Sequence, residues 1–468
     1  MSFASIDFLV FISLFFILWP LFKKRPLYKL IYILLASLVF YGWADIRNII
    51  FLSIISLFTF LWGKIIIQSS RGRNLILTIG LAIILAILVA YRYPILLGFS
   101  LNLFREQVEQ GTEWMTVGGR YFPLGISFIT LHCIGFLFDC KREMIRSPLK
   151  FIPFMAYLSF FPKLIAGPIE RYDELVPQLL KNGSIDDQAL WTGFKLIVYG
   201  YFYKTVLGDH LATYVGDAFG SDTVLHQSLY WWAIITAFAM QIYFDFRGYT
   251  NIARGLGNWM GISLRENFSH PYLSSSVGDF WNRWHISFSN WLRDYIYFPI
   301  ARSNTFLGNP YIAVWITMAF SGMWHGTGWT FLAWGLVMAF YISIERATNW
   351  PKRLSLNPFG RFFSRCVTLF QIWIAWVFFR SRDLAQALQI FKAQFAFPQQ
   401  ATSALPYQFW AFLLLAIGLE SLQASGIMNR LRTNSATSKM IEATLLTLVL
   451  VGNVLLRGAE NEFVYFQF

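Results

Sequence analysis

Long runs of residues without a single charge recur along this chain, and they constrain its fold more than any other feature. Each run approaches the roughly 20 apolar residues that an α-helix needs to cross the hydrocarbon core of a bilayer. Such runs repeat from one end of the chain to the other, which predicts a polytopic helical bundle and excludes a protein with one membrane anchor. The clearest runs are Leu30 to Ala44, Asn48 to Gly63, Leu75 to Tyr91, Tyr311 to Trp324, Gly326 to Ile344, Tyr407 to Leu419 and Leu445 to Leu456.

The composition agrees with an integral membrane protein. Charged residues make up 13% of the 468 residues and hydrophobic residues 56%, whereas a soluble domain carries roughly 25% charged residues. From the apolar runs we expect an all-α polytopic membrane protein with about 11 transmembrane helices, accompanied by re-entrant or interfacial helices.

The net charge of +13 does not indicate nucleic-acid binding, because the positions of the basic residues reflect membrane topology. Basic residues gather in alternate short loops, at Lys23 to Lys29, at Arg71 to Arg73 and at Lys141 to Lys150, while the opposite loop from Ser100 to Gly118 carries three glutamates. By the positive-inside rule the basic loops lie in the cytoplasm. We therefore expect a multi-pass protein whose N-terminus is extracytoplasmic.

Metal and cofactor sites are not predicted. The three cysteines, Cys133, Cys140 and Cys366, lack metal-ligand spacing, and two of them lie in or beside apolar tracts, which predicts buried thiols. Neither a glycine-rich nucleotide loop nor a hydrolase triad occurs, so we expect no tightly bound cofactor.

One histidine stands in the longest uncharged tract. Residues 303–344 contain no Lys, Arg, Asp or Glu, so His325 in SGMWHG (Ser321 to Gly326) is the only side chain there that titrates near neutral pH. An ionisable group in a membrane segment is expensive and usually faces a bundle interior, which makes His325 a candidate functional residue. The alternative is a neutral histidine whose ring is satisfied by a backbone carbonyl.

A second unusual segment, Asn267 to Ile300, is rich in Trp, Arg and His. Ser276 followed by Asp279 predicts a capped helix start, and Asp279 can pair with Arg283 one turn later. In such a helix Trp281 and His285 would share one face. The alternative is an amphipathic helix that lies in the membrane interface without taking part in chemistry.

Two further segments break the apolar pattern. Prolines and Gly167 interrupt the run FFPKLIAGPIERY (Phe160 to Tyr172), which predicts a re-entrant turn and not a full span. In QIYFDFRGY (Gln241 to Tyr249) we expect Asp245 and Arg247 to lie where an apolar helix ends, at a membrane boundary or in a polar cavity.

Six sequence blocks stand out in order along the chain. They are PLGISF (123–128), LIAGPIERY (164–172), QIYFDFRGYTNIARGLG (241–257), ENFSHPYLSSSVGDFWNRWHISFSNWLRDYIYFP (266–299), SGMWHG (321–326) and WVFFR (376–380). At these blocks the chain resembles the membrane-bound O-acyltransferase (MBOAT) family, in the bacterial branch of alginate O-acetyltransferases and teichoic acid D-alanyltransferases. The block typical of alginate-type members, DFSGYSD, reads DFRGYTN here, with Arg247 and Asn251 as departures.

This resemblance implies a helical fold with a central funnel or tunnel. It implies one membrane domain over residues 1–468, with peripheral N-terminal spans over 1–118, a catalytic core over 119–345 and C-terminal spans over 346–468. The near-invariant histidine of the family corresponds to His325, and a second position, His or Asn in the family, corresponds to His285.

Acyl transfer to a hydroxyl requires a base, a donor to the oxyanion and exclusion of water. We assign His325 as general base, and His285 as the residue that orients the acceptor hydroxyl or donates to the oxyanion. Asn282 or a backbone N–H of the glycine-flanked turn around His325 is a further candidate donor. A covalent acyl group on Ser321 is disfavoured because the residues around it lack a nucleophile elbow. The residues expected to line the substrate tunnel are Trp281, Asn282, Trp284, Ser321 and Trp324.

The resemblance implies an acyltransferase of the bacterial inner membrane that passes an acetyl group from a cytoplasmic thioester, acetyl-CoA, to hydroxyls of an extracytoplasmic polysaccharide. A periplasmic or membrane-anchored acetyltransferase partner is expected to complete the transfer. D-alanyl transfer to teichoic acid and acetylation of peptidoglycan are alternatives within the enzyme class. A transporter or channel with midplane histidines is the non-enzymatic alternative. On the enzyme hypothesis, His285 and His325 should face one cavity within the membrane.

Overall fold

The computed structural model describes residues 1–92, 116–117, 120–145, 149–181, 185–221, 228–305, 308–396, 405–426, 436–459 and 461. These residues form two compact units, one from 1–194 and 252–265 and the other from 195–251 and 266–468. Two helices, α9 (Asp187–Tyr201) and α11 (Ser228–Trp259), contribute to both units. The acidic loop from Ser100 to Gly118 lies almost entirely outside the described residues.

Unit 1 contains most of the N-terminal apolar runs, each folded as a helix. The antiparallel pair β1 (Thr116–Val117) and β2 (Arg120–Tyr121) aligns Thr116 with Tyr121. The other elements that lie wholly in unit 1 are α1 (Ile6–Phe22), α2 (Pro26–Gly42), α3 (Arg47–Gln68), α4 (Arg73–Arg92), α5 (Ile126–Lys141), α6 (Phe151–Ser159), α7 (Phe161–Leu164) and α8 (Tyr172–Leu180).

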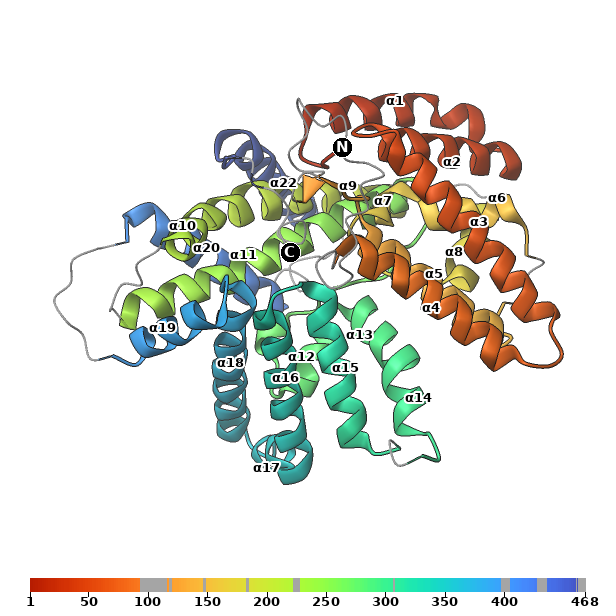
Figure 1. The fold of residues 1–468 in the computed structure, drawn as a ribbon. Coiled ribbons are helices and arrows are strands. Elements are labelled where there is room, and N and C mark those ends of the chain that lie inside the picture. The colour runs from red at the N-terminus through yellow and green to blue at the C-terminus, as the bar shows by residue number, and fades with distance from the viewer. Residues whose placement is uncertain are drawn as a thin grey trace. The chain divides into compact units, whose positions relative to one another are not determined.

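Unit 2 consists mainly of helices in its described part, with one isolated β-bridge between Phe268 and Trp284. Within it α15, α16 and α18 run side by side (Figure 1). Its elements, besides parts of α9 and α11, are the π-helix η3 (Phe202–Gly208), α10 (Asp209–Gly220), the 3-10 turn η4 (Pro271–Leu273), α12 (Val277–Arg283), α13 (Ile286–Leu292), the π-helix η5 (Arg293–Tyr297), α14 (Phe298–Ala301), α15 (Pro310–His325), α16 (Trp329–Thr348), α17 (Trp350–Leu354), α18 (Pro358–Arg380), α19 (Leu384–Gln394), α20 (Tyr407–Ala424) and α22 (Ala436–Leu455).

The helical membrane fold predicted from the apolar runs is confirmed. Among the described residues, α3, α4, α16 and α18 are long and apolar enough to cross a bilayer, and α1 and α2 are shorter apolar helices. Large apolar side chains point outward, as with Ile17 (70% exposed) and Leu21 (73% exposed) on α1, which is the arrangement that a lipid environment favours. The count of 11 spans and the central funnel stay predictions, as does the division at residues 118 and 345.

The expected helix end near Arg247 is wrong, because α11 continues to Trp259. The charges lie inside unit 2 and are satisfied there: Asp245 pairs with Lys204 at 2.8 Å, and Arg247 pairs with Glu420 at 2.9 Å. A buried charge is tolerated when an opposite charge neutralises it at hydrogen-bond distance. The two ion pairs therefore explain how one apolar helix carries both residues without ending.

The predicted break in FFPKLIAGPIERY is confirmed. The short helix α7 ends at Leu164, and the chain stays non-helical until α8 begins at Tyr172. Gly167 fits here because a β-carbon on it would lie 2.3 Å from the Lys163 Cα. Whether this turn enters the membrane stays a prediction.

Candidate active site

His325 is the last residue of α15, whose start is fixed by the Asn309 side chain, which accepts the Tyr311 N–H at 2.8 Å. The imidazole is 4% exposed, and its Nδ1 lies 2.6 Å from the carbonyl oxygen of Ser321. A carbonyl only accepts hydrogen bonds, so Nδ1 carries the proton and Nε2 carries the lone pair. The alternative of a histidine whose ring is satisfied by a backbone carbonyl thus has its contact. The same contact also selects the tautomer that a general base requires.

His285 joins α12 to α13 and is fully buried. Its backbone is left-handed, at φ 42° and ψ 54°, so the prediction that Trp281 and His285 share one helix face is wrong: α12 ends at Arg283. A left-handed residue other than glycine costs roughly 1–2 kcal/mol, and such conformations cluster at functional sites. Here the Ile286 N–H, which donates to the Asn267 carbonyl at 3.0 Å, helps to hold the turn.

The fold brings the two imidazoles to the same aromatic side chains. The Phe288 ring lies 5.0 Å from His285 and 5.5 Å from His325 between ring centroids. The Trp324 ring lies 6.4 Å from His285 and 4.8 Å from His325. Both imidazoles are buried, which disfavours their charged forms.

Other aromatic rings complete the surroundings of His325. Trp334 lies 5.0 Å and Phe379 5.4 Å from its ring, again between centroids. With Phe288 they were missed by the sequence analysis, because single aromatic residues in apolar helices carry no distinguishing pattern. Phe288 and Phe379 did have a signal, their places in the 266–299 and WVFFR blocks, whereas Trp334 lies in none of the blocks.

The remaining predicted residues are placed differently. Ser321 is adjacent through its carbonyl, and its buried hydroxyl has no hydrogen-bond partner among the described residues. Trp281 lies 5.8 Å from Trp334, the ring that in turn lies 5.0 Å from His325. Trp284 stacks on Phe280 at 5.5 Å and belongs to the core of unit 2. Asn282 is exposed, so it is not brought together with the buried histidines.

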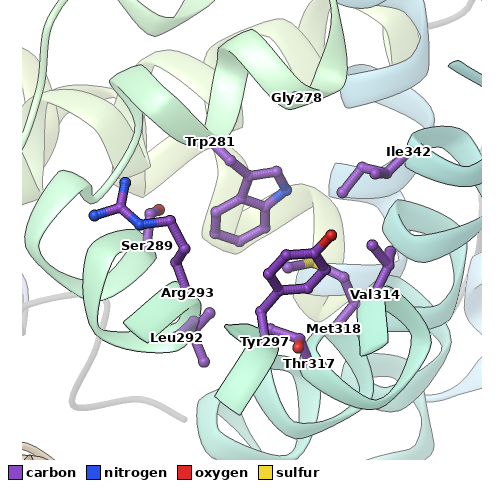
Figure 2. Close-up of a pocket in the computed structure, with 10 residues that line it drawn as sticks. All are labelled: Gly278, Trp281, Ser289, Leu292, Arg293, Tyr297, Val314, Thr317, Met318 and Ile342. Carbon is purple, nitrogen blue, oxygen red and sulfur yellow. The ribbon is translucent and has the colours of Figure 1, made fainter. Parts of the chain in front are cut away.

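Trp281 also lines a pocket of about 170 Å³ (Figure 2). The pocket lies between α12, the α13 to η5 segment, α15 and α16, and its wall is mostly apolar. Neither candidate histidine lines it. The prediction that both imidazoles face one cavity therefore stays a prediction, although the structure gives them common aromatic neighbours. The other lining residues are Gly278, Ser289, Leu292, Arg293, Tyr297, Val314, Thr317, Met318 and Ile342.

The segment that presents His285 is anchored at the start of α12. Ser276 accepts the Asp279 N–H at 2.8 Å, and Asp279 pairs with Arg283 at 2.9 Å, which confirms both predicted contacts. Glu345 on α16 accepts the first two N–H groups of α12, at 2.5 and 3.1 Å. A carboxylate is stabilising at a helix N-terminus. No sequence pattern pointed to Glu345, because its partners lie far away along the chain.

Close approach of α15 and α16 fixes the end of α15 that carries His325. A β-carbon on Gly322 would lie 2.3 Å from the Phe331 carbonyl oxygen. Since overpacking of this kind costs about 1–3 kcal/mol, we expect Gly322→Ala to lower the thermal unfolding midpoint in detergent and to reduce activity. Gly328→Ala is the matched control, because its β-carbon would meet only ordinary contacts from 3.4 Å. Equal midpoints for the two variants would contradict this packing argument.

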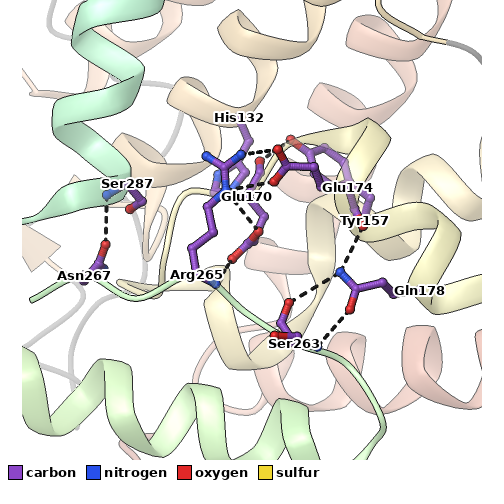
Figure 3. Close-up of polar contacts among 9 residues, drawn as sticks. All are labelled: His132, Tyr157, Glu170, Glu174, Gln178, Ser263, Arg265, Asn267 and Ser287. Carbon is purple, nitrogen blue, oxygen red and sulfur yellow. Dashed lines mark hydrogen bonds and ion pairs between the residues drawn. The ribbon is translucent and has the colours of Figure 1, made fainter.

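His132 shows what a structural histidine looks like in the same protein. In unit 1 its Nδ1 lies 2.7 Å from the Phe128 carbonyl oxygen, and its Nε2 accepts the Glu170 N–H at 3.3 Å. The Glu170 carboxylate accepts the Arg265 backbone N–H at 2.7 Å, and the Arg265 guanidinium pairs with Glu174 (Figure 3). One ring nitrogen of His132 is thus used within α5 and the other in holding the LIAGPIERY segment, which leaves none for a substrate.

Comparison with known proteins assigns the family. A family model described as MBOAT, membrane-bound O-acyltransferase family, matches residues 124–350, a range that includes both candidate histidines. A probable alginate O-acetylase of Pseudomonas aeruginosa is 32% identical over 407 residues, which cover 85% of this chain and 75% of the relative. The chain belongs to the membrane-bound O-acyltransferase family.

Two other relatives have different acceptors in their names. A peptidoglycan O-acetyltransferase of Helicobacter pylori is 30% identical over 399 residues, 79% of this chain and 74% of the relative. A teichoic acid D-alanyltransferase of Bacillus subtilis is 30% identical over 256 residues, 51% of this chain and 62% of the relative. The resemblance stated from the motif blocks is confirmed, and the protein is a membrane O-acyltransferase. This assignment favours the enzyme over the transporter or channel alternative.

Proposed function

We propose that this protein transfers an acetyl group from a cytoplasmic thioester, acetyl-CoA, to hydroxyls of an extracytoplasmic polysaccharide. The observation that carries the proposal is the pair of buried imidazoles that share Phe288 and Trp324 within the family-matched region. The relatives that match most of the chain are named for O-acetylation of alginate or of peptidoglycan, which favours acetyl over D-alanyl transfer.

In this mechanism the lone pair on His325 Nε2 accepts the proton of the acceptor hydroxyl while the hydroxyl oxygen attacks the thioester carbonyl carbon. The tetrahedral intermediate collapses as the carbon–sulfur bond breaks. The imidazolium then returns the proton to the leaving thiolate, so that an ester and a free thiol result. His285 orients the acceptor or donates to the oxyanion. The surrounding aromatic rings exclude water that would hydrolyse the thioester.

The sidedness of the reaction follows from the charge pattern. Basic loops at Lys23 to Lys29 and at Lys141 to Lys150 support an orientation with these loops in the cytoplasm and the N-terminus outside. The protein would then reside in the bacterial inner membrane, where the donor is cytoplasmic and the polysaccharide is not. A periplasmic or membrane-anchored acetyltransferase would accept the group and complete the transfer.

The proposal is tested in the source cell, where any partner is present. Deleting the gene should remove O-acetyl groups from the surface polysaccharide, as measured by mass spectrometry, and the wild-type gene should restore them. Inverted membrane vesicles supplied with labelled acetyl-CoA should pass the label to polysaccharide inside the vesicles. Label transfer from a D-alanyl thioester, with none from acetyl-CoA, would contradict the proposal and favour the teichoic acid alternative.

A further inference from the structure

A second pocket, of about 130 Å³, lies within unit 1, far along the chain from the candidate histidines. It is formed by the ends of α1 and α8 and by the start of α2. Residues just after α11 and just before α9 complete it. Three of its lining residues are lysines and none is acidic. The lining residues are Trp19, Lys23, Lys29, Lys181, Ile185, Met260 and Gly261.

Lys29 makes this pocket a built site and not a group of surface lysines. It lies in the first turn of α2 and is 5% exposed. Its ammonium donates to the carbonyl oxygens of Gln178 at 3.1 Å and of Lys181 at 2.6 Å, at the end of α8. An ammonium has three N–H donors. The two carbonyls therefore fix its position while neutralising none of its charge.

Trp19 supplies independent support. It lines the same pocket and is 4% exposed, and its indole N–H is buried without a hydrogen-bond partner among the described residues. A buried donor that lacks an acceptor is unfavourable. Because the indole lines the same pocket as the lysines, an oxygen atom of a bound ligand is a candidate acceptor for this N–H.

We propose that this pocket binds a phosphate ester. The arguments are the buried ammonium of Lys29, the additional charges of Lys23 and Lys181, and the indole donor of Trp19. Its volume of about 130 Å³ leaves room for one tetrahedral group with four oxygens. The phosphate belongs either to a lipid headgroup or to a soluble phosphate ester.

The position at the end of an apolar helix favours a lipid. Trp19 and Lys23 lie where α1 ends and the first basic loop begins. Tryptophan and lysine at that point are typical of headgroup depth, where anionic lipids attract cations. This site has no role in the proposed acyl transfer, so its occupancy is measured without reference to activity.

Native mass spectrometry of the full-length protein in detergent tests the proposal with three probes. Dioleoyl phosphatidylglycerol carries the phosphate on a lipid, dioleoylglycerol has the same tails without phosphate, and glycerol 3-phosphate carries the phosphate without tails. We expect phosphatidylglycerol to be retained and dioleoylglycerol to be lost. The double variant Lys23→Ala with Lys181→Ala, and separately Trp19→Phe, should each weaken retention about tenfold, the effect of losing a hydrogen bond to a charged group.

The control is Lys24→Ala, since Lys24 stands in the same loop but does not line the pocket. It should leave retention unchanged. Binding of glycerol 3-phosphate as tight as that of the lipid, with the same loss in the variants, would support the phosphate site and assign it to a soluble ester. Retention that is equal in wild type, the double variant and Trp19→Phe would overturn the proposal, as would equal binding of dioleoylglycerol. Unchanged unfolding midpoints show that these variants are folded.

Discussion

Replacing His325 with Gln lowers the rate of acyl transfer by about 10³-fold, the usual effect of removing a general base. Gln is close to His in size and offers an amide N–H to the Ser321 carbonyl, which His325 Nδ1 contacts at 2.6 Å. It has no nitrogen lone pair that accepts a proton near neutral pH. Donor binding should persist because only the proton acceptor is lost. Single-turnover transfer of labelled acetyl groups measures the effect.

His210→Ala is the matched control for this variant. His210 also places Nδ1 near the carbonyl four residues before it, 2.9 Å from the Val206 oxygen, but it lies on α10 against Phe412. Its removal should leave turnover within a factor of two. Wild-type turnover in His325→Gln would end the general-base assignment. If His325→Ala yielded no folded protein while His325→Gln remained active, the histidine would be structural.

The helices were predictable because an apolar run in a membrane has to satisfy its own backbone hydrogen bonds, which an α-helix does within one segment. Asn48 to Gly63 and Leu75 to Tyr91 lie in α3 and α4 as expected. The break at His285 was not predictable, because the sequence around it has the i, i+4 spacing of a continuous helix. The hydrogen bond from the Ile286 N–H to the Asn267 carbonyl, which helps to hold the bend, joins residues far apart in the sequence, and local sequence patterns do not reveal it.

The same limit applies to the partners of each predicted residue. His325 stood out as an ionisable group in an uncharged tract, yet the rings around it come from α13, α15, α16 and α18. Glu345 and Glu420 were missed because the groups that donate hydrogen bonds to them lie more than sixty residues away in the sequence. Sequence therefore identified which residues are unusual, and the structure was needed to show which of them meet.

The departure at Arg247 has a structural account. The side chain pairs with Glu420 and stands over the Tyr203 ring at 5.2 Å and the Tyr243 ring at 5.4 Å. A guanidinium prefers such a combination of carboxylate and aromatic faces. The larger, charged residue in the DFRGYTN block is thus balanced inside unit 2, with α20 supplying the carboxylate. It gives no reason to assign a different reaction.

Replacing His285 with Ala should lower the rate about 10²-fold, the effect of losing one donor to a developing oxyanion. Asn at this position should keep the rate within about tenfold of wild type, because its amide N–H still donates a hydrogen bond. Asparagine also adopts the left-handed conformation readily, whereas alanine there costs roughly 1–2 kcal/mol. The rate constant should fall while the KM for the donor stays constant, since His285 acts on the reacting oxygen.

Gly at position 285 separates the two roles that the structure gives to this residue. His285 holds a left-handed turn at φ 42° and also presents a ring against Phe288. Glycine relieves the backbone strain but donates nothing, so His285→Gly should unfold at a higher temperature than His285→Ala and remain as inactive. Full activity in the glycine variant would mean that position 285 serves the turn alone. The oxyanion would then need a hydrogen-bond donor other than His285. Asn282 does not supply it, because its side chain is exposed.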